Sequence, residues 1–263
     1  MRSSPVPSCA IVVFAALLGG CESASDAEGG PFGDYVESIK GTDIHFEMVW
    51  VPKGRFWMAR TEVTWDEYLP YCDFEEAGNV PPGVDAVAKP SKPLDDITPF
   101  DRDWGLGKQP AVGMSRNAAV KYCEWLSLNT GRAYRLPTEK EWELACGDRP
   151  EGGLDVYSWH EENSDQMAHE GGLKEPNTLG INDMLGNLWE YCLGPFSPDE
   201  PEREVLRGGS WSDPAAEIGP GARLGFEADW VLEDPNVPPG VWWVPDGDHL
   251  GFRILRSTEG AGN

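Results

Sequence analysis

The segment RLPTEKEWE, residues 135–143, fixes one element of the fold. Thr138 followed three residues later by Glu141 is a capping box, in which each side chain accepts a hydrogen bond from the backbone amide of the other residue. A helix is therefore predicted from Glu139 to about Cys146. The sequence beyond this helix changes to loops and short strands.

Two further helices are predicted upstream of this segment. Ser115 is a candidate N-cap for a helix with helically spaced apolar residues, and Gly131 ends it. Thr64 and Glu67 form another capping box, which opens a short helix to about Phe74. The helices are thus marked by their caps rather than by long apolar stripes.

Strand-like sequence lies at the two ends of the body. The stretch from His45 to Met58 is bulky and β-prone, with a turn at residues 52–54, and HLGFRIL at 249–255 is β-rich. Residues 78–110 are rich in proline and read as loop. Together these patterns predict an α+β domain with a long, internally packed loop region and few regular elements.

The composition limits the partners. The net charge is −24, so the surface repels phosphate backbones and nucleic acid is excluded as a partner. Acidic oxygens suit hard cations such as calcium, although most of the carboxylates are expected only to keep the protein soluble. Twelve Trp residues supply apolar material for a sizeable core.

The N-terminus carries an export signal. An apolar run from Ala10 to Leu18 has the length of a signal peptide and is too short to span a bilayer. It leads into Leu18-Gly19-Gly20-Cys21, which resembles the bacterial lipobox, where the cysteine becomes the lipidated first residue. We therefore expect a lipid anchor on Cys21 and a location in the cell envelope, on the periplasmic face or at the cell surface. The alternative is an ordinary secretory signal with a chance cysteine.

Four cysteines remain in the body of the chain: Cys72, Cys123, Cys146 and Cys192. An exported protein enters an oxidising compartment, where an even number of cysteines favours disulfides. Four cysteines allow three pairings, and the sequence leaves the choice among them open.

An ordered set of motifs resembles the formylglycine-generating enzyme family, also called the sulfatase-modifying factor domain. The matching residues are Val49-Trp50-Val51-Pro52, Glu62-Val63-Thr64, Tyr122-Cys123-Glu124-Trp125-Leu126, Arg135-Leu136-Pro137-Thr138-Glu139, Pro176-Asn177, Gly186-Asn187-Leu188-Trp189-Glu190, Leu206-Arg207-Gly208-Gly209-Ser210-Trp211 and Gly251-Phe252-Arg253. Each motif is weak alone, but their order and spacing make the set specific. The resemblance implies a C-type-lectin-like variant of the α+β class.

Four segments follow from these patterns. Residues 1–20 are predicted to be the signal peptide, 21–41 the lipidated cysteine with a flexible tether, 42–257 the formylglycine-generating enzyme-like domain, and 258–263 a tail. The tether is predicted from its small, polar and Gly-rich sequence.

The family's copper chemistry is not expected here. The resemblance implies two copper-binding cysteines, five residues apart, just after the Arg-Gly-Gly-Ser motif. Asp213 and Ile218 stand at those positions. Copper(I) prefers thiolates, which neither side chain supplies. We therefore expect no copper and no formylglycine-generating activity, and we favour a non-enzymatic role.

The histidines do not suggest another metal centre. Non-haem iron usually needs two histidines and a carboxylate on one face, and the four histidines here are scattered. His160 with Glu161 and Glu162 is the one suggestive cluster, and it is read as a solvated loop.

A calcium site is implied by the family resemblance at residues 183–190. Matching the motif position by position gives Asp183 and Glu190 as side-chain ligands, and Gly186 and Leu188 as donors of carbonyl oxygens. Calcium accepts such a mixture of carboxylates and carbonyls. The alternative is a metal-free turn in which Glu190 forms a salt bridge.

A binding groove is also implied. Arg207, Ser210 and Trp211 match positions that line the family's substrate groove, and they would either line a pocket or simply pack. Trp230, Trp242 and Trp243 would suit peptide or sugar recognition if exposed, and the alternative is that they are buried and fill the core.

The leading hypothesis is therefore a non-catalytic, calcium-stabilised envelope lipoprotein that binds a protein or glycan. The alternative is an oxidoreductase or a maturation factor that acts on another exported protein through a divergent site.

Overall fold

The computed structural model describes residues 32–73, 105–149, 151–234 and 239–258. The predicted signal peptide, Cys21, most of the tether, most of the proline-rich loop and nearly all of the tail lie outside these ranges. Within them, no helix is long and apolar enough to cross a membrane.

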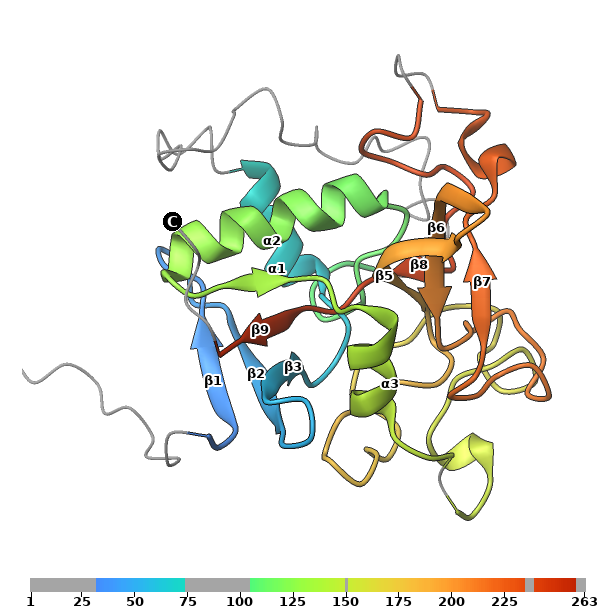
Figure 1. The fold of residues 1–263 in the computed structure, drawn as a ribbon, viewed down its shortest axis with the longest axis horizontal. Helices are drawn as coiled ribbons and strands as arrows, with labels where there is room; N and C mark the ends of the chain where they lie inside the picture. The colour runs from blue at the N-terminus through green and yellow to red at the C-terminus, as the bar shows by residue number, and fades with distance from the viewer. Residues whose placement is uncertain (1–31, 74–104, 150, 235–238, 259–263) are drawn as a thin grey trace, which may run out of the picture.

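A five-stranded sheet forms one half of the molecule, with strand order β1-β2-β3-β9-β4 and antiparallel pairing throughout. Its strands are β1 (Tyr35–Ser38), β2 (His45–Val51), β3 (Phe56–Ala59), β4 (Tyr134–Arg135) and β9 (Leu255–Ser257). Strands from both ends of the described chain therefore meet in one sheet (Figure 1). The predicted strand from His45 to Met58 is confirmed as the β2–β3 hairpin.

A four-stranded sheet forms the other half, in the order β7-β6-β5-β8. Its strands are β5 (Trp189–Ser197), β6 (Glu200–Arg207), β7 (Arg223–Gly225) and β8 (Leu250–Gly251). The β5–β6 hairpin holds the longest strands of this sheet, where the sequence pattern indicated only loops and short strands. Strand β8 pairs in parallel with β5 and brings the C-terminal motif beside Glu190.

The three helices begin where their predicted caps stand. They are α1 (Trp65–Asp73), α2 (Arg116–Thr130) and α3 (Glu139–Cys146). Ser115 caps α2, and Gly131 ends it in the left-handed conformation. Thr138 and Glu141 form the predicted capping box of α3. In Figure 1, α2 lies across the five-stranded sheet and α3 lies between the two sheets.

The core consists of two clusters on opposite faces of the five-stranded sheet. Alternate residues of a strand point to opposite faces. Met48 and Trp57 therefore join the larger cluster with α1 and α2, while Val49 and Met58 join the smaller cluster with α3 and β5. The mixed, loop-rich α+β class is confirmed.

Two expectations differ from the structure. Strand β1 lies inside the segment assigned to the tether, because its backbone pairs with β2 over four residues. The predicted disulfides are not formed, because Cys123, Cys146 and Cys192 are buried free thiols within the packed clusters. Burial also raises the pKa of the Cys146 thiol to about 12, which keeps it neutral.

Candidate functional site

The turn at residues 183–190 connects the loop region to β5 and is tightly constrained. Asp183, Gly186 and Asn187 adopt left-handed backbone conformations, with φ values of 55°, 74° and 59°. A Cβ atom at Gly186 would lie 2.1 Å from the carbonyl oxygen of Trp159. Glycine is therefore required at this position both by conformation and by the close approach of the neighbouring loop.

Glu190 is held by a buried ion pair. Arg253 donates to both carboxylate oxygens of Glu190, at 2.7–2.9 Å, and Trp142 Nε1 donates to Oε2 at 2.7 Å. The guanidinium also donates to the backbone carbonyls of four residues: Ala59, Arg60, Asn182 and Asp183. The cation at the centre of this turn is therefore an arginine, and the oxygens of Glu190 are fully used as acceptors.

Two more carboxylates are buried beside this ion pair. Glu62 accepts a hydrogen bond from Asn187 Nδ2 at 3.1 Å, and Asp183 accepts one from Gly172 N at 2.7 Å. The second oxygen of each, Glu62 Oε2 and Asp183 Oδ1, has no partner among the described residues. Three buried carboxylates thus face one arginine, and the cluster favours a proton or a cation at the unpaired oxygens.

The pKa values follow from this crowding. Burial, reinforced by repulsion from Asp183, raises the pKa of Glu62 well above its usual range. Burial raises the pKa of Asp183 to about 6, although the Gly172 amide and Arg253 oppose the shift. Neither Glu62 nor Arg253 was predicted as a site residue. Their only signal in the sequence is their place in the Glu62-Val63-Thr64 and Gly251-Phe252-Arg253 motifs.

The side chains of two predicted calcium ligands, Asp183 and Glu190, are already engaged in hydrogen bonds in this arrangement. Asp183 retains one unpaired oxygen, but Glu190 is bonded to Arg253 and Trp142. Among the described residues, no group of three or more His, Cys, Asp or Glu side chains is arranged to hold a metal ion. For calcium to bind at this turn, Glu190 would have to break its hydrogen bonds to Arg253 and Trp142, or a water molecule would have to serve as ligand instead of Glu190.

The two positions that match the copper cysteines are part of the fold's own packing. Asp213 Oδ2 accepts hydrogen bonds from the hydroxyl and the amide of Ser210, at 2.5 and 2.8 Å. Ile218 is 2% exposed, and a Cβ atom at Gly209 would lie 2.7 Å from its side chain. One position therefore caps a turn and the other fills the apolar core.

The residues predicted to line a groove are mostly buried. Arg207 is 1% exposed, donates to Glu139 and Glu143 at 2.9 and 2.8 Å, and lies over the Trp142 ring. Ser210, Trp211 and Trp243 are also buried. Trp230 and Trp242 keep part of their surface exposed. The structure therefore does not bring these six residues together along one open surface.

Trp230 belongs to a partly exposed aromatic ridge. Its ring makes edge contacts with Phe226 and His249, at centroid distances of 5.2 and 4.9 Å. Trp230 stands in the short 3-10 helix η4 (Ala228–Val231), and Leu232, which follows it, is 74% exposed. We call Phe226 and Trp230, together with the exposed apolar Leu232, the aromatic ridge.

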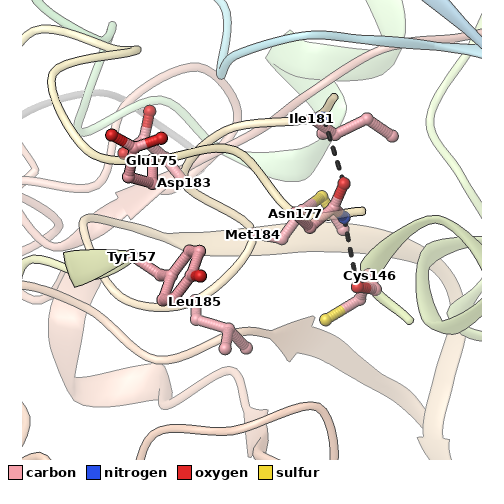
Figure 2. A pocket seen from close by; sticks show the side chains of 8 residues that line it. All are labelled: Cys146, Tyr157, Glu175, Asn177, Ile181, Asp183, Met184 and Leu185. Atoms are coloured by element: carbon pink, nitrogen blue, oxygen red, sulfur yellow. Dashed lines mark hydrogen bonds between the residues drawn. The ribbon is translucent and has the colours of Figure 1, made fainter. Parts of the chain in front are cut away.

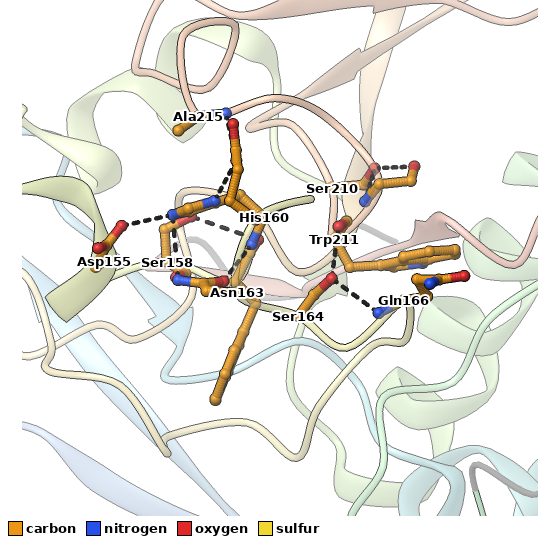
Figure 3. A network of polar contacts seen from close by, with 12 residues as sticks. Asp155, Ser158, His160, Asn163, Ser164, Gln166, Ser210, Trp211 and Ala215 are labelled. Carbon is orange, nitrogen blue, oxygen red and sulfur yellow. Dashed lines mark hydrogen bonds and ion pairs between the residues drawn. The ribbon is translucent and has the colours of Figure 1, made fainter.

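The side chain of His160 is buried, whereas a solvated loop was expected, and its two carboxylate partners are exposed. Its side chain is 3% exposed, with Nε2 2.8 Å from Asp155 and Nδ1 2.7 Å from Glu162. Glu162 also accepts a hydrogen bond from the amide of Ala215 (Figure 3). Nδ1, through Glu162, thus helps to hold the loop around residue 160 against the loop that follows Ser210, while Nε2 holds Asp155.

A small pocket opens beside Asp183 (Figure 2). Its empty volume is about 260 Å³ even when space open to solvent is included, and its lining is apolar at Ile181, Met184 and Leu185 and polar at Glu175 and Asp183. Sites for organic ligands usually measure roughly 300–1,000 Å³. The pocket is therefore too small to enclose a glycan or a peptide.

Comparison with known proteins identifies the class. Residues 28–234 match the family described as the sulfatase-modifying factor enzyme 1-like domain, which is more than half of the chain. The chain therefore belongs to this family, as its motifs predicted.

Its relatives differ in activity. The chain is 32% identical over 172 residues to the Mus musculus protein "Inactive C-alpha-formylglycine-generating enzyme 2", covering 57% of this chain and 49% of that protein. It is 31% identical over 144 residues to "Hercynine oxygenase" of Mycobacterium tuberculosis, covering 44% and 32%. The chain thus spans about half or less of the length of these curated relatives. With its altered copper positions, it is a non-catalytic or divergent member of the family.

Solved structures support the fold. The Treponema denticola variable protein 1 aligns with a TM-score of 0.57 at 21% identity, covering 85% of this chain and 98% of that one. At this identity the likeness concerns the fold alone.

Proposed function

We propose that this protein is a non-catalytic, lipid-anchored envelope protein whose domain binds a protein or glycan partner. We also propose that its fold is the C-type-lectin-like variant of the family. One observation carries the proposal that the protein is not catalytic. At the two positions where the family has copper-binding cysteines, Asp213 caps a turn and Ile218 fills the apolar core. The similarity to a relative named as inactive supports it.

The aromatic ridge supports the binding part. The pocket beside Asp183 is too small for a large ligand, so a partner would meet the outer surface. Partly exposed aromatics are enriched at such contacts. Asp229 and Glu233, which flank Trp230, are exposed carboxylates that would favour a partner with basic or hydroxyl groups.

The test of non-catalysis combines metal analysis with oxygen consumption. The purified chain is expected to contain no stoichiometric copper or iron, and to consume no oxygen when given a cysteine-containing peptide. Stoichiometric copper or iron, or oxygen uptake that depends on the peptide, would support the alternative of an oxidoreductase or maturation factor.

The test of binding uses a photo-crosslinking amino acid at position 232 in the cell that expresses the protein. A discrete adduct is expected from this position. The matched control is position 173, where Leu173 is 62% exposed in a loop. If both positions give only the same background level of crosslinking, the aromatic ridge is not the binding surface.

A further inference from the structure

Four aromatic rings gather where the described chain begins. Phe32 lies 5.0 Å from Trp50, and Trp50 lies 4.6 Å from Trp57, measured between ring centroids. Tyr35 makes an edge contact with Trp57 at 5.8 Å. Phe32 is 47% exposed and Trp50 is partly exposed, so the cluster reaches the surface at one end of the five-stranded sheet.

Basic side chains surround these rings. The guanidinium of Arg55 lies 5.5 Å from the centre of the Phe32 ring, and that of Arg256 lies 4.4 Å from the Trp57 ring. The β2–β3 turn, residues 52–55, exposes Lys53 and Arg55 and contains no acidic residue. Asp34, which accepts a hydrogen bond from the amide of Trp50, is an exposed acidic neighbour, but Lys53 and Arg55 outnumber it, which is unusual in a chain with a net charge of −24. We call Phe32, Trp50, Lys53 and Arg55 the aromatic–basic patch.

The patch stands at the entry of the chain into the domain. Phe32 follows Cys21 by eleven positions. Even a fully extended chain of that length spans only about 38 Å. A lipid on Cys21 would therefore keep the patch near the bilayer. In Figure 1, the blue start of the chain and the β2–β3 turn lie at the same end of the sheet.

We propose that the aromatic–basic patch rests on the anionic phospholipid headgroups of the membrane that holds the lipid anchor. This inference rests on the proposed anchor at Cys21. Aromatic rings and Lys or Arg side chains are the groups that membrane interfaces favour. The remaining, acidic surface is repelled by anionic headgroups, so the charges also orient the domain with the patch toward the membrane.

A weak contact is sufficient in this arrangement. A short flexible linker gives an effective concentration on the order of millimolar. A patch that binds headgroups too weakly to recruit a free domain is therefore still occupied when the domain is tethered. The consequence is a fixed orientation, which turns the opposite side of the domain, including the aromatic ridge, away from the bilayer.

The experiment uses the lipidated chain in vesicles of zwitterionic phospholipid mixed with phosphatidylglycerol. One nitroxide is placed at Pro52→Cys, in the exposed turn, and in a separate protein at Leu232→Cys. The second position lies beside η4, on the opposite side of the domain, in orange-red in Figure 1. The relaxation of each nitroxide by a lipid-soluble and a water-soluble agent is measured. We expect several-fold stronger lipid accessibility at position 52, which falls in purely zwitterionic vesicles.

The matched variant carries Phe32→Ser with Arg55→Ser. It is expected to float with the vesicles as before and to melt at an unchanged temperature, while the label at position 52 becomes as water-exposed as the label at 232. Flotation with equal accessibility of the two labels in the unmodified patch would overturn the inference and leave the anchor intact. Failure of the lipidated chain to float would overturn the anchor, and the inference with it.

Discussion

Arg253 and Glu190 lie 63 positions apart in the chain and meet as a buried ion pair between the two sheets. Taking two charges out of water is costly, and the cost is offset here by hydrogen bonds to nearly every donor and acceptor of the pair. The pair also connects β5, the segment before β9 and the turn at residues 183–190. Its main effect is therefore to fix the relative positions of three segments.

Replacing Glu190 with Gln is expected to destabilise the domain by about 3 kcal/mol, because it removes the counter-charge that is directly hydrogen-bonded to the buried arginine. The measurement is the free energy of urea unfolding. The control is Glu47→Gln, since Glu47 is 55% exposed in its ion pair with Arg60 and should change stability by less than about 1 kcal/mol. Similar effects of the two substitutions would contradict the central role of the buried pair.

The raised pKa of Glu62 predicts that the stability of the domain depends on pH. Its pKa in the folded protein is raised by burial and by Asp183, so the stability that it contributes is fully present below its unfolded pKa and is lost as pH rises through the folded value. Asp183, with a pKa raised to about 6, acts in the same direction. The domain is therefore expected to lose stability as pH rises from the ordinary carboxyl pKa values through about 6, where Asp183 ionises, with Glu62 extending the loss to higher pH.

The variant Glu62→Gln is expected to flatten this dependence, because the amide is neutral at every pH. Urea unfolding across the pH range measures the slope. Glu67, whose pKa burial raises to about 7, contributes to the slope of both proteins. The difference between the two slopes therefore reports Glu62, and identical slopes would show that its charge is not suppressed in the fold.

At the scale of elements, the caps determine where the helices begin. The Thr138 hydroxyl accepts a hydrogen bond from the Glu141 amide, and Glu141 accepts from the Thr138 amide and from Arg135. These contacts are local in sequence, so they could be predicted. Strand β1 could not be predicted, because its four residues have little pattern of their own and become a strand only through pairing with β2.

Thr138→Ala is expected to destabilise the domain by about 1 kcal/mol, the usual effect of losing an N-cap. The change should appear in the unfolding free energy, with faster amide hydrogen exchange in the first turn of α3. Thr178→Ala serves as the control, because Thr178 is exposed and outside the helices. Unchanged exchange in α3 would mean that packing against β5 alone defines the start of the helix.

At the scale of the whole molecule, the calcium prediction concerns how the long loop region is held. If calcium binds at Asp183, added calcium raises the unfolding temperature, a chelator lowers it, and Asp183→Ala responds to neither. Asp199→Ala, at an exposed acid in the turn between β5 and β6, should respond like the unmodified chain. If neither calcium nor chelator changes the unfolding temperature, calcium does not hold this turn, and among the described residues Arg253 is the cation at its centre.

The sequence by itself determined the helix caps, the family and the loss of the copper cysteines. These features are either local along the chain or matters of residue identity, so no knowledge of packing is needed to read them. The tertiary structure alone decided that Glu190 pairs with Arg253, that His160 is buried, and that Cys146 and Cys192 stay thiols. Each of these outcomes depends on which distant residues are packed together, and hydrogen-bond partners and burial are set by that packing.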